Sequence, residues 1–263
     1  MAKLSGPLRF EGKLDEFSAY KMKGCEGTVL RMGWGPSKKD VHTKDCYELL
    51  RKNNREFGGR STTAAYLKRV LKPLEGVLDY NLSSAFTGLL KPMQEADQES
   101  RWGNRNVLIS RKPFLLEGLN LNRRNPFDAV VSSAIQSKVD KVAGTALVNV
   151  PELLPSVNFF PPTNFSVCRI TAVMGIAPDF YYAEPRYKPL PAFTKWQNVT
   201  ASSEWFLASK GCPSCELDLS LPATLPEEGF SLLVAVGIEV GTPLMGEMVP
   251  LRYNGCGKIV VVK

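Results

Sequence analysis

FSLLVAVGIEV, the stretch at residues 230–240, is apolar at nearly every position. A strand with one solvent-facing side alternates apolar and polar residues, whereas a strand covered on both faces is apolar throughout. We therefore expect this segment to be a central strand of a sheet, with other elements packed on both of its sides.

Further strand candidates surround this segment in the C-terminal part of the chain. They are separated by loops rich in proline or glycine, a spacing typical of an antiparallel, Ig-like β-sandwich. These candidates are TALVNV (145–150), NFSVCRITAVMG (164–175), SEWFLA (203–208), CELDLSL (215–221) and GKIVVVK (257–263). The proline-rich and aromatic segment 177–193 is expected to be a loop or a docking arm.

The N-terminal part predicts a different architecture. Residues 1–35 contain short strand candidates broken by glycines, which indicates a small β-meander. A helix is expected to start at Thr43 and to stop at Gly58-Gly59. Two further helices are expected, one from Ser61 with an interruption at Pro73 and one over 82–90 that ends at Pro92.

Between these helices and the β-rich part, NVLISR (106–111) and PFLLEG (113–118) are expected to be strands. Asn125-Pro126 predicts the start of one more helix that reaches Ile135. The chain is thus predicted to be an α+β protein with two domains. Residues 1–145 form a basic β-meander and helical hairpin, and residues 146–263 form the β-sandwich.

The positive charge is concentrated in the N-terminal part. The net charge is +7; residues 1–150 hold 25 Lys and Arg against 16 Asp and Glu, whereas residues 151–263 hold 8 against 10. Such a basic half attracts polyanions, or lets copies of the chain meet head to tail through opposite charges. In a third interpretation, the Lys and Arg side chains have no partner and only keep the helix faces in contact with water.

The basic residues most suited to a polyanion or a partner lie on the expected helices and in two Arg/Asn-rich loops. Arginine and asparagine suit phosphate groups and base edges, and Tyr47, Phe57 and Tyr66 are interleaved with the cations. The candidates are Arg51, Lys52, Arg55, Lys68, Arg69, Arg101, Arg105, Arg123 and Arg124.

The stretch GCPSCELDLSLP (211–222) holds a C-x-x-C pair. A redox pair needs a helix N-terminus to lower the thiol pKa, but the alternation after Cys215 predicts a strand, with Cys215 facing inward. A zinc site needs four ligands, and the candidates would be Cys212, Cys215, Cys256 and Cys168. The favoured interpretation is a tight turn whose thiols act as small apolar fillers in a reducing compartment.

Other chemistry is sparse in the sequence. His42 is the single histidine, and no nucleophile elbow, P-loop or dinucleotide fingerprint occurs. We expect a non-enzymatic protein without cofactor or small-molecule substrate. The first residues hold no apolar signal core, and no run of about 18 apolar residues occurs, so we expect a cytoplasmic protein that does not span a membrane.

Gly6, Gly12-Lys13-Leu14, Arg31 and a helix start at Thr43 resemble the opening of an uncharacterised Bacteroidota family, a domain of unknown function. That family has a glycine-rich N-terminal strand segment and an Ig-like C-terminal domain, and the resemblance implies this architecture but no activity. The second glycine that the family has after the lysine is missing here, and the tryptophan comes later, at Trp34.

These observations favour a structural subunit that self-assembles or docks in a larger assembly, such as a filament, tube, sheath or phage-like particle. Its partners would be other copies of itself or another assembly component. Two alternatives stay open: a nucleic-acid-binding protein that uses the basic helices at 43–75, and a zinc-stabilised interaction module.

Overall fold

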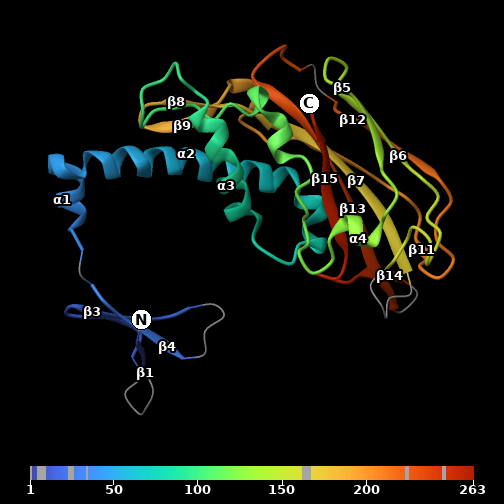
Figure 1. Cartoon of the computed structure of the whole chain (residues 1–263), viewed down its shortest axis with the longest axis horizontal. Coiled ribbons are helices and arrows are strands. Elements are labelled where there is room, and N and C mark those ends of the chain that lie inside the picture. Colours follow the sequence, from blue (N-terminus) through green and yellow to red (C-terminus); the bar gives the residue numbers. More distant parts are fainter. Residues whose placement is uncertain are drawn as a thin grey trace. The chain divides into compact units, whose positions relative to one another are not determined.

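The structure is a computed structural model, and its contacts divide the chain into two compact units, Met1–Arg51 and Lys52–Lys263 (Figure 1). It describes residues 2–4, 10–22, 27–33, 35–161, 167–222, 225–244 and 247–263. Gly6 and Trp34, which carry part of the family resemblance, lie outside the described residues. In the described part of the chain, no helix has the length and apolar character needed to cross a membrane.

The first unit contains the predicted β-meander. Strands β2 (Gly12–Leu14), β3 (Phe17–Lys21) and β4 (Thr28–Met32) are antiparallel neighbours, and β1 (Ala2–Leu4) pairs with β4. The turn between β2 and β3 needs a left-handed residue, and Asp15 supplies it with φ of 49°.

The first helix begins earlier than predicted. Helix α1 (Lys38–Thr43) is capped by Ser37, whose hydroxyl accepts a hydrogen bond from the Asp40 N–H while the Asp40 carboxylate accepts one from the Ser37 N–H. A 3-10 helix, η1 (Asp45–Tyr47), follows. The helix predicted from Thr43 corresponds to η1 and α2, which begin at Asp45 and Glu48, and α1 was not predicted. Thr43 is the last residue of α1 and caps no helix.

The second unit is built on a six-stranded antiparallel sheet. Its central strands, β7 (Val167–Pro178) and β13 (Phe230–Leu244), pair from Phe230–Pro178 to Gly241–Val167. Strand β13 is buried throughout 230–240, as its apolar sequence predicted. The flanking strands are β10 (Asn198–Ser202) and β11 (Phe206–Leu207) beside β7, and β14 (Glu247–Pro250) and β15 (Cys256–Val262) beside β13.

A smaller antiparallel sheet covers one face of the large one. It has the order β12 (Cys215–Ser220), β6 (Thr145–Val150) and β5 (Gln136–Asp140). Its inward side chains, such as Val148 and Leu217, share a core with Ile170 and Val236 of the large sheet. The predicted α+β class with a C-terminal antiparallel sandwich is confirmed, whereas the Ig-like character stays a prediction.

Helices cover the other face of the large sheet. These are α2 (Glu48–Val70), the 3-10 helix η2 (Lys72–Val77) and α3 (Leu82–Glu95). Leu67 and Leu74 share a second core with Leu233 and Ala235 of β13. Because the helices from residue 52 onward pack on the sheet, the contacts divide the chain after Arg51 and not at the predicted boundary between residues 145 and 146.

Two predicted helix ends are wrong. Helix α2 runs straight through Gly58-Gly59, and α3 continues past Pro92 to Glu95. Gly59 is buried against the ring of Tyr187, and a Cβ at that position would lie 2.8 Å from the ring. Gly59 therefore allows α2 to lie against the ring of Tyr187, and it does not end the helix. The predicted interruption at Pro73 is confirmed, since Pro73 lies in the first turn of η2.

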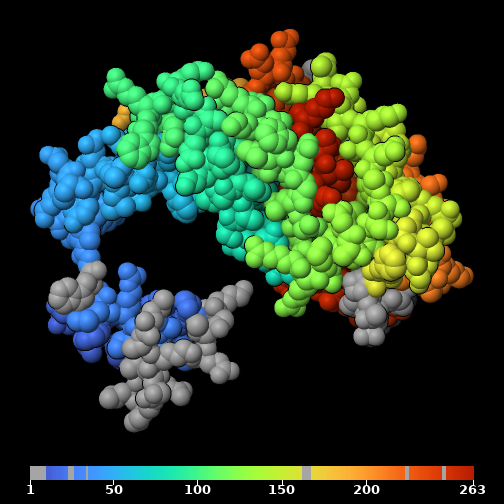
Figure 2. All heavy atoms as spheres, viewed as in Figure 1, coloured from blue at the N-terminus to red at the C-terminus, as the bar shows by residue number. Residues whose placement is uncertain are grey.

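The segment between α3 and the small sheet has less regular structure than predicted. NVLISR and PFLLEG are not strands but hold the 3-10 helices η3 (Ile109–Arg111) and η4 (Pro113–Leu116). Helix α4 (Phe127–Val130) is a single turn and stops well before Ile135. Backbone hydrogen bonds such as Leu121 N–H to Gly257 O hold this segment beside β15, which Figure 2 shows as a red strip next to it.

The proline-rich stretch forms a regular hairpin, contrary to the prediction of a loop or arm. Strands β8 (Phe180–Ala183) and β9 (Arg186–Pro189) pair around a cis Glu184–Pro185 bond, and the 3-10 helix η5 (Pro191–Phe193) follows. Phe180 and Tyr187 are buried in the core under the helices. Their burial explains the aromatic content of this segment.

The contact between Gly59 and Tyr187 predicts opposite effects for two neighbouring substitutions in α2. Gly59→Ala should lower the free energy of unfolding by about 1–3 kcal/mol, because the added methyl group overlaps the ring. Gly58→Ala is the matched control: nothing lies within 4 Å of its Cβ position, so it should stabilise the exposed helix by about 1 kcal/mol. Urea unfolding of both variants measures this, and equal effects would contradict the assigned contact.

Candidate functional site

The nine candidate cations do not form one surface. Arg51 lies in the first unit, where its guanidinium donates to the carbonyl oxygens of Val41 and Lys44, both at 2.8 Å. The other eight lie in the second unit, in three groups: beside the loop after α3, at the C-terminal end of α2, and before α4. Arg51 therefore holds the chain between α1 and α2.

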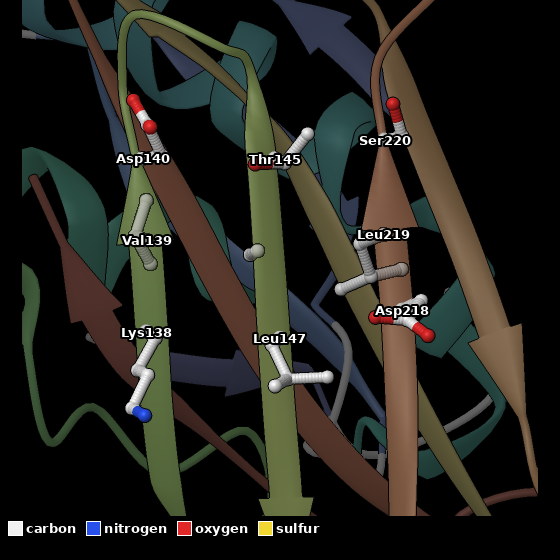
Figure 3. Close-up of a pocket in the computed structure, with 9 residues that line it drawn as sticks. Lys138, Val139, Asp140, Thr145, Leu147, Asp218, Leu219 and Ser220 are labelled. Carbon is white, nitrogen blue, oxygen red and sulfur yellow. The ribbon is translucent and has the colours of Figure 1, made fainter.

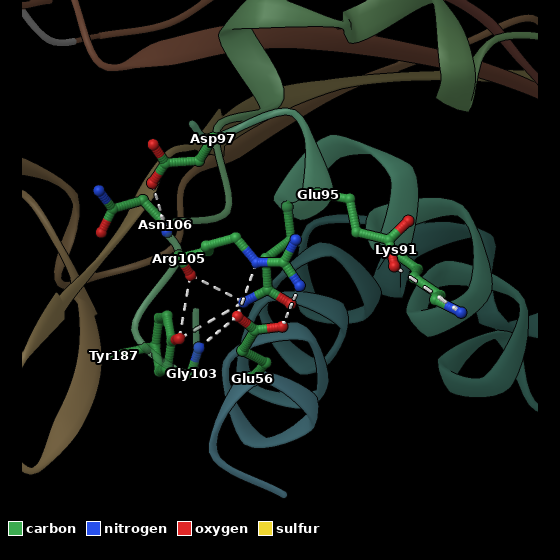
Figure 4. A network of polar contacts seen from close by, with 9 residues as sticks. Glu56, Lys91, Glu95, Asp97, Gly103, Arg105, Asn106 and Tyr187 are labelled. Carbon is green, nitrogen blue, oxygen red and sulfur yellow. Dashed lines mark hydrogen bonds and ion pairs between the residues drawn. The ribbon is translucent and has the colours of Figure 1, made fainter. Parts of the chain in front are cut away.

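Arg105 is bound by a buried carboxylate (Figure 4). Its Nε and Nη2 atoms each donate to a different oxygen of Glu56 at 2.7 Å, and the Gly103 N–H donates to the same carboxylate at 2.8 Å. Burial by itself would raise the pKa of Glu56, but the bonds from Arg105 and Gly103 outweigh it and lower the pKa. Arg105 thus fixes the loop to α2 and is not free for a ligand.

The same loop is held at further points. The Asp97 carboxylate accepts the backbone N–H of Asn106 at 2.8 Å, and the Tyr187 hydroxyl donates to the Arg105 carbonyl at 3.0 Å (Figure 4). The buried side chain of Gln94 also donates to the Arg105 carbonyl, at 2.9 Å. The loop 97–106 is therefore fixed to α2, α3 and the β8–β9 hairpin.

Lys52, Arg55 and Arg101 lie around this fixed loop. The Lys52 ammonium lies 5.8 Å from the centre of the Trp102 ring, and the Arg55 guanidinium lies 5.5 Å from that of Tyr182. Arg55 also donates to the side chain of Asn104. Trp102 is 48% exposed, so about half of this large aromatic side chain is in contact with solvent.

A cavity of about 520 Å³ lies next to Trp102, between α2, α3 and the loop. Arg60 contributes to its wall, with its guanidinium 5.9 Å from the centre of the exposed Phe57 ring. The residues that line it are Asn53, Glu56, Arg60, Lys91, Glu95, Trp102 and Arg105. We call the cavity together with Lys52, Arg55, Phe57 and Arg101 the Trp102 surface.

The remaining candidates lie elsewhere in the second unit. Lys68 and Arg69 line a separate cavity of about 440 Å³ with Lys72 and Glu75. The backbone N–H groups of Arg123 and Arg124 donate to the Asp79 carboxylate at 2.9 and 3.1 Å, and the Arg123 guanidinium stacks 4.1 Å from the centre of the Tyr80 ring.

The four candidate zinc ligands are free cysteines, and their environments raise their pKa values. Burial raises the pKa of Cys168 to about 12, and burial together with the neighbouring Cys215 raises that of Cys212 to about 11. Burial also raises the pKa of Cys215 and of Cys256. Cys215 is half-buried on the core side of β12, as predicted. Among the described residues, no three His, Cys, Asp or Glu side chains gather closely enough to hold a metal ion.

A shallow cavity of about 380 Å³ lies along the small sheet (Figure 3). In the register of β5, β6 and β12, Lys138 pairs with Leu147 and Leu147 pairs with Asp218. Lys138 and Asp218 therefore lie on either side of Leu147 in one row across the sheet. The cavity is lined by residues of these three strands alone.

The first unit presents an apolar row that the sequence did not reveal. Leu14, Phe17 and Met32 are direct cross-strand partners on β2, β3 and β4, and they are 63%, 40% and 47% exposed. The next row, Lys13, Ser18 and Arg31, faces the other side because successive residues of a strand alternate. The strands are only three to five residues long, so the sequence pattern alone does not reveal this register.

Trp102 and Glu56 were also missed as site residues. A signal for Trp102 existed, since it lies within RWGNRN beside two of the candidate arginines. No local signal could have joined Glu56 to Arg105, which follows it by 49 residues. Conversely, Tyr66 was expected among the surface cations, but it is buried and donates to the Lys195 carbonyl.

Comparisons with family models, curated proteins and solved structures gave no significant match. The resemblance to the Bacteroidota family stays a prediction.

The Glu56–Arg105 pair predicts a pH-dependent loss of stability. Glu56→Ala should lower the free energy of unfolding by about 3 kcal/mol at pH 7, because it leaves a mostly buried guanidinium without its partner. The lowered pKa means that the pair stabilises the fold above pH 4.5, the unfolded value of Glu56. This stabilisation is lost as the pH falls through the folded value, so the wild-type advantage should shrink in acid.

The exposed pair of Lys91 and Glu95, 3.8 Å apart, supplies the control for this prediction. Glu95→Ala should cost less than about 1 kcal/mol. Denaturant unfolding at pH 7 and pH 3.5 measures both variants. A cost for Glu56→Ala that equals that of Glu95→Ala would show that the buried pair does not hold the loop.

Proposed function

We propose that this chain is a cytoplasmic, non-enzymatic structural subunit that assembles with copies of itself, as in a filament, tube, sheath or similar particle. The observation that carries this proposal is the exposed apolar row of Leu14, Phe17 and Met32 on the first unit. Rows of this kind on the face of a small sheet are suited to docking against another surface.

The small core of the first unit supports the need for a partner. Of its described side chains, only those of Ala19, Thr28 and Val29 are buried. A sheet of short strands needs a covered hydrophobic face to be stable in water, and units of about 50 residues have little core to spare. Covering the apolar row in an assembly would supply that missing burial.

A ribbon at the other end of the chain provides a fitting surface on a second copy. The last residues of β13 pair with β14, and on this ribbon Leu244 and Val249 lie on one face and are both exposed. Glu247 lies on the same face. The first unit is basic, with 10 Lys and Arg against 7 Asp and Glu in residues 1–51, so its net charge is opposite in sign to that of Glu247.

Contact between the row of one copy and the ribbon of the next is heterologous. Repeated in one direction from copy to copy, such a contact produces rings or open filaments. Growth of this kind is what the proposal expects of a filament, tube or sheath. Two other arrangements would also cover the apolar row: contact with the ribbon of the same chain, and contact with an unrelated protein. The following experiment distinguishes them from self-assembly.

Sedimentation velocity over a hundredfold range of protein concentration tests the proposal. Wild type should form species that grow with concentration, and the double variant Phe17→Asp/Met32→Asp should remain a monomer because it places charges in the apolar row. Leu244→Asp/Val249→Asp should have the same effect from the ribbon side.

Ser18→Asp is the matched control, because Ser18 lies on the same strand as Phe17 and faces the other side. It should assemble like wild type. A wild-type protein that stays monomeric at every concentration would refute the proposal. The apolar row would then be covered within one chain or by another protein. Unchanged assembly of both double variants would refute the proposed contact.

A further inference from the structure

We propose that the Trp102 surface binds single-stranded nucleic acid, with a base stacked on Trp102 and phosphate groups bound by the cations around the cavity. The proposal concerns the second unit alone and does not rest on self-assembly. It replaces the broad region of basic helices at 43–75 by one surface, formed by the first half of α2, the end of α3 and the loop that follows α3.

Trp102 has the properties of a stacking platform. About half of its surface is exposed, and it is carried by a loop that Glu56 and Asp97 fix through buried hydrogen bonds. Proteins that bind single strands combine such aromatic rings with a cationic groove, because every base offers a π-face. The exposed ring of Phe57 lies beside Arg60 in the same way.

The charges of the Trp102 surface are predominantly positive. Arg105 is bound to Glu56, so the charge of one lining carboxylate is already neutralised. Lys91 lies 3.8 Å from Glu95, but both are exposed, and such pairs exchange partners at little cost. Arg55, Arg60 and Arg101 then leave the surface positive.

Arg60 supplies a specific indication that an acceptor is missing. Its Nε atom is buried and has no hydrogen-bond partner within the described part of the chain. A buried donor without an acceptor costs free energy, and nearly all such groups in proteins are satisfied. Arg60 also lines the cavity, so a phosphate group bound there would pair with its guanidinium.

The shape of the site favours a single strand over a duplex. The cavity of about 520 Å³ falls in the size range of sites for small organic groups, so it can hold one nucleotide. A duplex offers mainly its phosphate backbone to such a surface. An unpaired base can reach Trp102, whereas a paired base is already stacked inside its helix.

Fluorescence anisotropy with a labelled 12-mer oligo(dT) and oligo(U), and with a blunt duplex of the same length, tests this inference at 50 and 200 mM NaCl. Wild type should bind the single strands more tightly than the duplex, and the affinity should fall as salt rises. Trp102→Ala should weaken single-strand binding roughly tenfold or more, whereas Trp102→Phe should retain most of the affinity.

The cations should affect the salt dependence as well as the affinity. Arg60→Ala should lower the slope of log K against log salt by about 0.7, the value for one phosphate contact on a single strand. Trp196→Ala and Lys210→Ala are matched controls, since both side chains are exposed elsewhere on the second unit. Both controls should bind like wild type.

Absence of single-strand binding at 50 mM NaCl overturns the proposal. Equal affinities of wild type and Trp102→Ala also overturn it, and equal binding of duplex and single strand would show only a polyanion-attracting patch. Thermal melting verifies that each variant is folded. If Trp102→Ala does not fold, Trp102→Phe and Arg60→Ala decide the question through the affinity and the salt slope.

Discussion

The burial of β13 on both faces is the constraint on which the second unit depends. One face packs against the small sheet and the other against α2 and η2, so both cores form along this single strand. The helices lie close to the large sheet because two of its strand positions at the contact are glycines. A Cβ on Gly237 would lie 2.8 Å from Leu74, and a Cβ on Gly175 would overlap Val70. The position of the helical layer is thus determined by the sheet.

The sequence predicts those parts of the fold that depend on local patterns. The continuous apolar run of β13 and the alternation in β12 both indicate burial, and both strands form as expected. Gly58-Gly59 is also a valid local signal for a helix end, but Tyr187, far along the chain, decides the role of Gly59. The proline-rich segment was misjudged for the same reason, since the core that buries Phe180 is assembled from distant elements.

The candidate cations show a similar limit. Residue type and charge density identified the basic helices. They did not show which of the cationic side chains form hydrogen bonds or ion pairs with other groups of the chain. Arg105 binds Glu56 and Arg51 binds backbone carbonyl oxygens, and both assignments require the folded structure. The exposure of the Trp102 ring likewise follows from the loop conformation, which the residue types in RWGNRN do not predict.

The anchoring of the loop 97–106 has a consequence for the thermodynamics of binding. A mobile loop loses conformational entropy when a ligand immobilises it, and that loss reduces the affinity. Here the carboxylates of Glu56 and Asp97 have already immobilised the backbone around Trp102 during folding. Any molecule that docks on this ring therefore meets a preorganised surface, and most of the ordering cost has been met by the folding of the chain.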